Sequence, residues 1–527
     1  MLRSVMAPGL VPYDFKAISA LTDWRDNLRW PTDPRDASGL ANALTDGYLS
    51  FAASTDSKTA AVLMLSSASV LALALVYAES SHVAQAAAGH GIALVGGPPE
   101  ALYLRGEGAL CDLPPQRKRH VRGRPRSLHF ARSIKNSAAI AGVAGFLGQF
   151  LEGPVIISRN SLLEAHVRRR RMPARFVYPE NLLAGLEDGA ANIAAPSHLG
   201  DAVEALVASL TTVSKLAEPF AERFSRLLTA FAHDHAETAS RHLQFLIDSK
   251  RLPEILYSGT AGNYMARLAG VAVAQRGGRA VRFDHGGPSL LASGNKLGHC
   301  QVEDSVSTEV MLPSSTLARV AEARYSQSPF AKRPVAFDSD AGDTAYALGG
   351  RDKVPAQSAR RVLYVPTLLS GFWQYIVPDL PDVVSLDWQI RLAGQLAKLP
   401  IDLVCKPHPE GELANLPNPL EAVSKVSYEP FEAHLRKTDV FVLDLMSSTT
   451  FWKAMCTDVP VVYVDLGINR FDDWIRPIVS ARCRIVEARY DERNLPYVDE
   501  EALEHAVCDA PQVCDGQPIR TLMGIGA

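Results

Sequence analysis

The fold is decided by residues 438–465, which read TDVFVLDLMSSTTFWKAMCTDVPVVYVD. The apolar run VFVLDL predicts a buried strand, and TTFWKAMCTD, after the serines, predicts a helix. The next run, VPVVYVD at 459–465, predicts a second strand. Because a strand, a helix and a strand in this order form a right-handed crossover, the two strands are expected to lie parallel in one sheet.

Both halves of the chain repeat this alternation. Strand, helix and strand are expected in turn at 254–259, 260–278 and 280–287, and again at 360–367, 386–399 and 401–409. Residues 328–360 are rich in Pro, Gly, Asp and Ser, which predicts a linker. The sequence therefore predicts an α/β fold of two Rossmann-like domains that face a cleft, with extra helices in the N-terminal half.

The expected domains are unequal in size. An N-terminal α/β domain spans 1–340; its first 150 or so residues are expected to alternate between helix and strand. It includes a helical insertion at about 198–250, where apolar residues recur at helical spacing. A C-terminal Rossmann-like domain spans 358–500, and the tail at 501–527 is expected to pack back on the N-terminal domain.

Composition excludes several classes of protein. With 527 residues, 47% of them hydrophobic and 21% charged, the chain is neither disordered nor a small disulfide scaffold. A net charge of -3 argues against general DNA binding. The seven cysteines form no CxxC pair and no signal-peptide pattern is visible, so we expect a cytoplasmic protein. The dinucleotide and P-loop glycine motifs are also absent from the sequence.

One uncharged stretch is long enough to cross a membrane. Residues 59–78, TAAVLMLSSASVLALALVYA, match the roughly 20 residues that a span requires. Serines interrupt the middle of the stretch, and a predicted strand follows at 91–97. We therefore favour a helix buried between domains or against a sheet, since a lone span inside an α/β pattern is topologically awkward.

Two motifs at predicted strand ends point to phosphate binding. Lys406-Pro407-His408-Pro409 follows one strand, and Ser447-Ser448-Thr449-Thr450 separates another strand from its helix. An anion at that helix N-terminus would receive hydrogen bonds from free backbone N–H groups, from Lys406 and from His408. Alternatively, the serines only cap the helix and KPHP is only a turn. Because both motifs fall at equivalent strand ends of one domain, we favour a site for the phosphate of a nucleotide-activated donor.

These motifs resemble those of known transferases. KPHP followed by a serine turn resembles the donor-phosphate motifs of GT-B glycosyltransferases that use CMP-sialic acid or CMP-Kdo, including bacterial polysialyltransferases and capsule Kdo transferases. VLYVPT (362–367) and DLMSSTTFWKAMCTDVPVVYVD (444–465) also look like segments of the CDP-glycerol glycerophosphotransferase superfamily. The resemblance covers roughly 360–470 and implies a GT-B fold and a cytidine-nucleotide donor. The donor-binding residues that it implies are Lys406, His408, Pro409, Thr367, Ser447, Ser448 and Thr449.

A weaker resemblance lies in the first half. Phe283-Asp284-His285-Gly286-Gly287-Pro288 is similar to the strand-end His-Gly segment of these transferases, where the histidine faces the acceptor. The resemblance implies that His285 is the catalytic base, with Asp284 orienting it and Gly286 and Gly287 close to substrate. A solvated loop histidine is the alternative. The chain has Gly-Gly where the teichoic-acid enzymes have Gly-Thr, and it lacks an obvious acidic Asp/Glu-Asp/Glu-Gly motif of the sialyltransferases.

A loop of small residues is a further candidate for substrate contact. Ser258-Gly259-Thr260-Ala261-Gly262-Asn263 follows a predicted strand and leads into a helix. Gly259 and Thr260 would admit substrate closely, and Asn263 and Arg267 would contact a carboxylate. A tight turn without any ligand explains the same residues equally well. Glu410 and Asp444, beside the donor motifs, are expected to support neighbouring side chains rather than bind a metal.

Two basic segments stand out against the near-neutral average charge. Residues 117–133 contain seven Lys or Arg and no acid, and residues 166–175 read HVRRRRMPAR. They are either solvated surface or a patch that contacts an anionic membrane or an acidic acceptor.

The sequence thus predicts a metal-independent transferase without a cofactor. It would move an acidic sugar from a CMP-activated donor to a glycan, lipid-linked or protein acceptor, without a nucleic-acid partner. The alternatives are a CDP-glycerol-type polyol-phosphate transferase and a catalytically silent GT-B-like scaffold in surface-glycan assembly.

Overall fold

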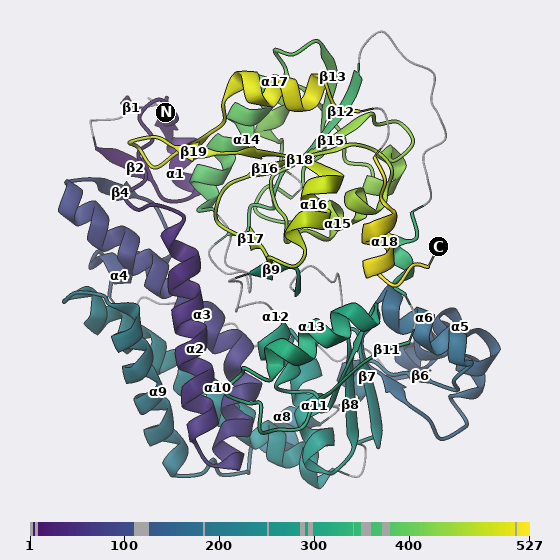
Figure 1. Ribbon diagram of the computed structural model, residues 1–527. Coiled ribbons are helices and arrows are strands. Elements are labelled where there is room, and N and C mark those ends of the chain that lie inside the picture. The colour runs from purple at the N-terminus through teal and green to yellow at the C-terminus, as the bar shows by residue number, and fades with distance from the viewer. Residues whose placement is uncertain are drawn as a thin grey trace.

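The computed structural model of the chain contains two six-stranded sheets in which all strand pairings are parallel (Figure 1). The structure describes residues 4–5, 9–109, 126–182, 185–249, 252–284, 290–293, 299–340, 342–348, 360–371, 380–414, 416–511 and 514–526. The prediction of an α/β fold with two Rossmann-like sheets and additional N-terminal helices is confirmed at this level.

The first sheet has the strand order β11-β10-β8-β7-β5-β6. Its strands are β5 Val155–Ile156, β6 Arg175–Phe176, β7 Ile255–Ser258, β8 Arg279–Phe283, β10 Glu309–Leu312 and β11 Ala336–Ser339. The covering helices include α6 Ser161–Arg170, α11 Tyr264–Gln275 and α13 Ser315–Tyr325. Since the chain leaves β5 toward β6 and then returns to β7 on the other side, the topological switch point lies between β5 and β7.

The second sheet has the doubly wound order β14-β13-β12-β15-β16-β18. Its strands are β12 Arg360–Val365, β13 Ile401–Cys405, β14 Lys425–Val426, β15 Val440–Leu443, β16 Val461–Asp465 and β18 Cys483–Glu487. Helices α14 Asp382–Leu396, α15 Thr449–Cys456 and α17 Glu500–Cys508 belong to this domain. Its switch point lies between β12 and β15, where ligands of such sheets bind.

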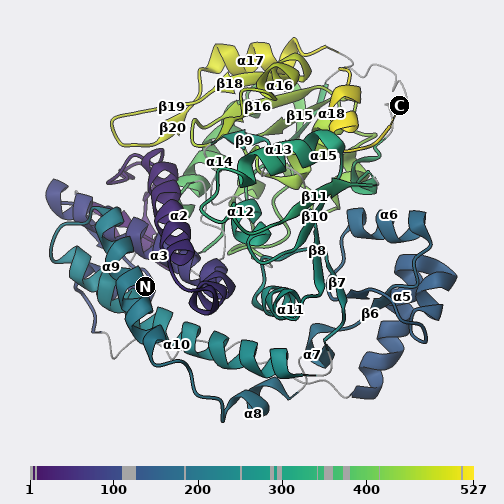
Figure 2. The same ribbon diagram turned by 60° about the horizontal axis from the view of Figure 1, so that its bottom comes forward.

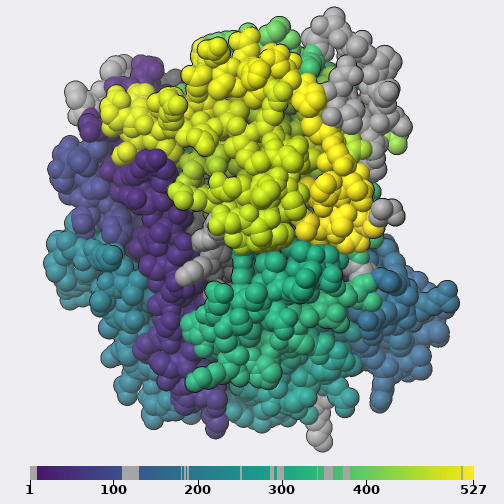
Figure 3. All heavy atoms as spheres, in the orientation of Figure 1, coloured from purple at the N-terminus to yellow at the C-terminus, as the bar shows by residue number. Residues whose placement is uncertain are grey.

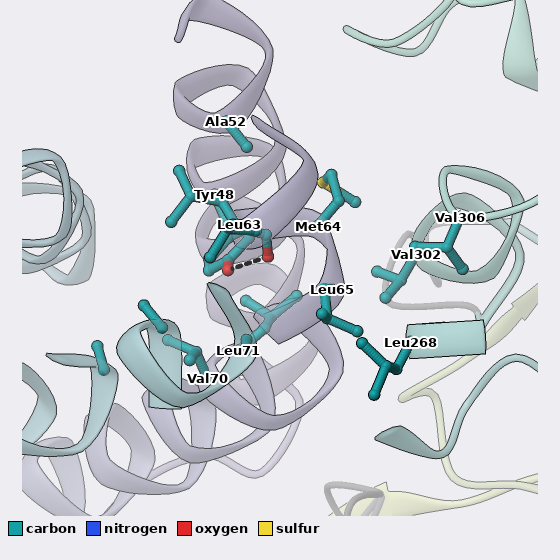
Figure 4. Packing of buried hydrophobic residues seen from close by; sticks show 14 of the residues in the cluster. Tyr48, Ala52, Leu63, Met64, Leu65, Val70, Leu71, Leu268, Val302 and Val306 are labelled. Carbon is teal, nitrogen blue, oxygen red and sulfur yellow. Dashed lines mark hydrogen bonds between the residues drawn. The ribbon is translucent and has the colours of Figure 1, made fainter. Parts of the chain in front are cut away.

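Four long helices pack together beside the first sheet (Figure 2). They are α2 Asp36–Ser54, α3 Ser57–His90, α9 His198–Ser214 and α10 Phe220–Asp248. Inside this bundle the hydroxyl of Tyr48 donates to the carbonyl of Leu63 over 2.7 Å (Figure 4). The residues predicted as a helical insertion, about 198–250, thus form α9 and α10, which pack with α2 and α3 from the N-terminal region.

The uncharged stretch at 59–78 lies within α3, and most of its side chains are buried. By length and hydropathy α3 is the one candidate membrane span among the described residues, and 61% of its most apolar window is buried inside the protein. It contacts α2, α10 and α11. The prediction of a buried helix is confirmed. The helix is buried in a helical bundle, where a position between the domains or against a sheet was expected. A helix that is apolar on all sides needs partners around its circumference, and the bundle supplies them.

Two predictions about chain organisation are wrong. The described part of the first 150 residues does not alternate between helix and strand: it is mainly helical, with β2 Leu10–Pro12 and β4 Ala93–Val95 as short strands. Residues 336–339, assigned to the linker, form edge strand β11. Because β11 has only four residues and none of them is fully buried, it lacks the apolar run that identifies an inner strand.

Helix α5, Arg126–Leu147, has 22 residues and is kinked at Gly142. The remaining elements are short: β1 Ser4–Val5, α1 Phe15–Ala20, β3 Leu21–Thr22, α4 Pro99–Arg105, α7 Pro179–Leu182, α8 Leu186–Ala190, β9 Ala292–Ser293, α12 His299–Asp304, η3 Thr344–Tyr346, η4 Pro419–Ala422, η5 Phe431–His434, β17 Arg470–Phe471, α16 Arg476–Arg482, β19 Arg489–Tyr490, β20 Pro496–Tyr497 and α18 Gln517–Leu522. Strands β9 and β17 pair antiparallel and so connect the two domains.

Both ends of the chain pack against the second domain (Figure 3). Near the N-terminus, Arg25 forms an ion pair of 3.0 Å with Asp387 of α14, and the N–H of Trp30 donates to the carbonyl of Arg493. At the C-terminus, α18 packs on α15, and the carbonyl of Met523 accepts a hydrogen bond from the N–H of Asp343. The tail therefore lies at the junction of the two domains.

Helix α3 also brings a buried carboxyl group to the second domain. Burial, followed by the charge of Asp382, raises the pKa of Glu79 to about 7. Asp382, at the start of α14, accepts hydrogen bonds from the N–H groups of Ser370 and Gly371, and burial raises its pKa to about 6. The two acids thus repel each other where α3 meets the loop after β12.

This repulsion predicts a pH dependence of stability. Because the pKa of Glu79 is higher in the folded state than its ordinary value of 4.5, folding binds a proton over that interval, and its contribution to stability falls as pH rises toward 7. We expect the melting temperature of wild type, relative to Glu79→Gln, to fall between about pH 5 and pH 8 in a thermal unfolding series. Glu237→Gln on α10 controls for the loss of one charge. Identical pH profiles for wild type and Glu79→Gln would contradict the assignment.

Candidate functional site

The carboxyl ends of β13, β12 and β15 lie side by side in the second sheet. Lys406 to Pro409 follow β13, Thr367 follows β12, and Ser447 to Thr449 follow β15. The structure therefore brings the predicted donor-binding residues to one edge, at and next to the switch point.

A buried carboxylate holds this edge together. Asp444 accepts hydrogen bonds from the hydroxyl of Tyr364 at 2.7 Å, from Thr367 Oγ1 at 3.0 Å and from the indole N–H of Trp388 at 3.0 Å. Burial raises the pKa of Asp444, and the three donors counteract this shift. Because the Thr367 hydroxyl donates to Asp444, Thr367 positions the loop and keeps only lone pairs for a ligand.

Lys406 is a buried cation at this edge. Its residue surface is 7% exposed, and no described residue accepts a hydrogen bond or forms an ion pair with its amine. Burial lowers the pKa of Lys406, and the charge of Glu432 opposes this shift. A largely buried lysine side chain without a hydrogen-bond acceptor is costly, so Lys406 is a candidate contact for a negatively charged ligand.

His408 and Pro409 lie on the exposed part of the same loop. The Nδ1 atom of His408 accepts a hydrogen bond of 3.1 Å from the N–H of Glu410. Burial lowers the pKa of His408, Glu410 opposes this shift, and the charge of Lys406 adds to it. Because Nδ1 accepts this hydrogen bond, the proton of the neutral ring lies on Nε2, which can donate to a phosphate oxygen.

The serine turn forms the N-terminus of α15. Ser448 is the N-cap, and its Oγ accepts a hydrogen bond of 3.1 Å from the N–H of Thr450. Ser447 and Thr449 are exposed at the same turn. The alternative interpretation, that a serine caps the helix, is thus correct for Ser448. The positive end of the helix dipole still faces the edge that contains Lys406.

Three charged or titratable residues near Lys406 were not predicted from the sequence. Lys453 of α15 forms an ion pair of 2.5 Å with Glu432, which also interacts with Lys406. His434 is buried, its Nε2 lies 3.0 Å from Ser427 Oγ, and burial, opposed by Glu429, lowers its pKa. Lys453 was detectable, because it lies four residues after Thr449 on the same helix face. Glu432 and His434 lie in the short 3-10 helix η5, which has no recognisable sequence motif.

The first sheet also gathers polar groups at its switch point. Asn160 caps α6, and its Nδ2 donates to the carbonyls of Gly259, Phe283 and Asp284. A Cβ atom on Gly259 would lie 2.7 Å from the backbone of Arg159, so only glycine fits at this crossing. Gly259 therefore allows two loops to meet, and Asp284 is buried beside them.

The other residues of the small-residue loop have internal partners. Thr260 Oγ1 donates to Glu303 Oε1 at 3.1 Å, and Asn263 caps α11 by accepting from the N–H of Ala266. The interpretation of this loop as a tight turn thus fits the structure better than a substrate contact for Asn263.

The placement of Arg267 contradicts its predicted contact with substrate. Its guanidinium group is fully buried, and its donors reach five acceptors: the carbonyls of Met64, Leu65, Ala261 and Val302 and the hydroxyl of Ser67. All five N–H bonds are therefore used. Arg267 fastens α3 to α11, a role that helix periodicity alone did not reveal.

Asp284 belongs to a buried charged cluster. Arg282 pairs with Asp304 at 2.6 Å, with Glu303 at 3.1 Å and with Asp284 at 3.4 Å. Burial raises the pKa of Asp304 to about 7, against the opposing charge of Arg282. The predicted residues His285, Gly286 and Gly287 directly follow Asp284 and lie outside the described residues.

Electrostatic interactions link the polar residues after β8 in the first sheet to those after β13 in the second sheet. Asp343 accepts a hydrogen bond from the hydroxyl of Ser161 at the start of α6. Burial raises the pKa of Asp343, Asp284 raises it further, and Lys453 counteracts both. Since Lys453 also pairs with Glu432 beside Lys406, the polar ends of β8 and β13 belong to one electrostatic environment.

Within the described ranges, no group of three or more His, Cys, Asp or Glu residues could hold a metal ion.

The buried position of Arg267 leads to a stability prediction. In Arg267→Met, the carbonyls that it serves lose their donors, at a cost on the order of 3 kcal/mol or more. We expect a clearly lower melting temperature in the absence of any ligand, whereas Arg276→Met at the exposed end of α11 should change it little. An Arg267→Met protein that melts like wild type would instead indicate a ligand contact.

Comparison of the chain with protein-family models, curated proteins and solved structures finds no match. The resemblance to cytidine-dependent transferases therefore rests on the motifs themselves.

Proposed function

We propose that the protein is a GT-B-type glycosyltransferase that moves an acidic sugar from a CMP-activated donor to a surface-glycan, lipid-linked or protein acceptor. The main observation in support is Lys406, a buried cation beside the switch point of a doubly wound sheet, without a partner among the described residues. Such an edge is where this class of sheet binds nucleotides.

The donor phosphate would lie between the loops after β13 and β15. Lys406 supplies a positive charge, His408 donates from Nε2, and the α15 N-terminus contributes its dipole. The geometry thus favours an anion, while the motif resemblance points to cytidine and to a sialic-acid-like or Kdo sugar.

The first domain would present the acceptor. His285 follows β8 and Asp284, and Asp284 shares an electrostatic environment with Lys453 of the donor side. An imidazole with a pKa near neutrality can take the proton of an acceptor hydroxyl as this attacks the anomeric carbon.

During transfer, the bond between the anomeric carbon and the CMP phosphate oxygen breaks, and the phosphate keeps the electron pair. A bond forms between the acceptor oxygen and the anomeric carbon, and the acceptor proton passes to His285. Lys406 and His408 would stabilise the negative charge that accumulates on the departing phosphate, which is where fixed donors assist catalysis most.

Binding of CMP tests the donor half of the proposal. CMP should raise the melting temperature of wild type, because a ligand that binds only the folded state stabilises it. Lys406→Ala and His408→Ala should each weaken CMP binding by about tenfold to a hundredfold, as expected for a lost charge-assisted hydrogen bond.

The control is Lys425→Ala, which removes an exposed lysine from neighbouring β14. Unchanged CMP affinity in both variants would refute the donor site. A larger shift with CDP than with CMP would favour a CDP-glycerol-type transferase, and no shift with any nucleotide would favour a silent scaffold.

The rate of sugar transfer tests the acceptor half of the proposal separately from the donor half. His285→Ala should reduce the transfer rate by about 10²–10⁴-fold, the usual contribution of a general base, and should leave the CMP-induced thermal shift intact. His505→Ala, an exposed histidine of α17, is the matched control. Full turnover by His285→Ala would exclude it as the base.

A further inference from the structure

An apolar stripe is exposed at the end of α5 and in the turn that follows. Val143, Phe146, Leu147, Phe150 and Leu151 are 76%, 45%, 46%, 69% and 52% exposed. Their spacing of three and four residues is that of one helical face, with Val143, Phe146 and Leu147 inside α5 and Phe150 and Leu151 in the turn after it. These five are most of the large hydrophobic residues exposed in the described part of the chain.

The local backbone holds this stripe outward. Gly142 has non-helical angles, with φ 59° and ψ -136°, and the chain folds back there. A Cβ on Gly145 would lie 1.9 Å from the carbonyl oxygen of Ser137, so the two arms are in close contact. Ser137 Oγ accepts from Gln149 Nε2 at 2.7 Å and from the N–H of Phe176 at 2.8 Å. The stripe is thus part of a fixed hairpin on β6, and α5 lies at the outer margin of the first domain (Figure 2).

Cations without an ion pair lie on α5, at the end of the neighbouring helix α6 and on the neighbouring strand β6. Arg132 and Lys135 on α5, Arg171 after α6 and Arg175 on β6 are exposed and have no ion pair among the described residues. By contrast, Arg168 forms an ion pair with Glu164 and Arg170 with Asp340, and Arg169 donates a hydrogen bond to the backbone carbonyl of Asp340. Residues 117–125 of the first basic segment lie outside the described residues, and so do the side chains of residues 126–129.

We propose that this apolar stripe and its four cations dock the protein on an anionic membrane, with Phe146 and Phe150 inserted at the interface. Aromatic and aliphatic side chains beside exposed cations are the combination that binds the boundary of an anionic bilayer. A second copy of the chain is a poorer occupant, because a two-fold interface would bring the same cations together.

If the proposed function holds, docking through the stripe also determines how far the acceptor edge lies from the membrane. Helix α6 runs from Asn160, at the switch point of the first sheet, to the arginines beside the stripe. Its 10 residues span about 15 Å. A membrane-docked protein would therefore hold its acceptor edge near the lipid surface, where a lipid-linked acceptor would be reached.

Vesicle flotation tests the docking surface independently of any transfer activity. The full-length protein should float with vesicles of phosphatidylcholine and phosphatidylglycerol, bind pure phosphatidylcholine less, and lose binding as salt rises. Phe146→Ser combined with Phe150→Ser should weaken binding by about tenfold or more. Leu416→Ser combined with Tyr428→Ser removes two exposed apolar side chains from the second domain and should have no effect.

A second measurement reports insertion directly. In Phe150→Trp, the emission of the introduced indole should shift to the blue on addition of anionic vesicles and be quenched by brominated lipid. Equal flotation of wild type and the double serine variant, or an indole emission in Phe150→Trp that vesicles leave unchanged, would overturn the proposal. Self-association that the double variant abolishes, without vesicle binding by wild type, would overturn it in favour of a second copy. A loss of transfer activity with intact flotation would bear on the proposed function alone.

Discussion

The carboxylate of Asp444 is the interaction on which the candidate donor edge depends. It joins β12, through Tyr364 and Thr367, to α14, through Trp388, and it lies itself at the end of β15. A buried carboxyl group is costly without donors, and three donors at 2.7 to 3.0 Å satisfy it here. The loops on either side of the switch point are consequently fixed by a polar network in addition to the sheet. Lys406, one strand away, therefore belongs to a preorganised surface, as electrostatic stabilisation of a leaving phosphate requires.

The relation between the two domains follows from contacts that are distant in sequence. Residues from both sheets share one buried apolar cluster, which includes Leu312 of β10 and Phe451 of α15. The N-terminal segment packs on α14 through Arg25, and the C-terminal helix α18 lies against α15. Lys453 then interacts electrostatically with Asp343, while it pairs with Glu432. The order of elements along the chain thus separates the domains, whereas the packing of both chain ends ties them together.

Much of the fold was predictable because parallel strands buried on both sides are continuous apolar runs. VFVL, VVYV and their neighbours are such runs, and the KPHP and SSTT motifs follow them where a strand-end site is expected. Predictions were wrong where the local pattern is weak or where a partner is remote. Strand β11 is a half-exposed edge strand. Arg267 donates to carbonyls of α3 that lie some 200 positions earlier in the chain. No periodicity within α11 distinguishes an arginine that binds a ligand from one that ties two helices together.

The partners of each buried cation distinguish a side chain that joins two elements from one that is available to a ligand. Arg267 donates to five acceptors, Arg482 to four backbone carbonyls, and Arg282 pairs with three carboxylates. Each of these arginines therefore has protein groups that offset the loss of hydration. The Lys406 side chain is less deeply buried than these arginines, but no described group accepts a hydrogen bond from its amine, and Glu432, whose charge acts on it, is already paired with Lys453. A cation in this state is stabilised when an anion binds, and for that reason Lys406 supports the proposed phosphate site.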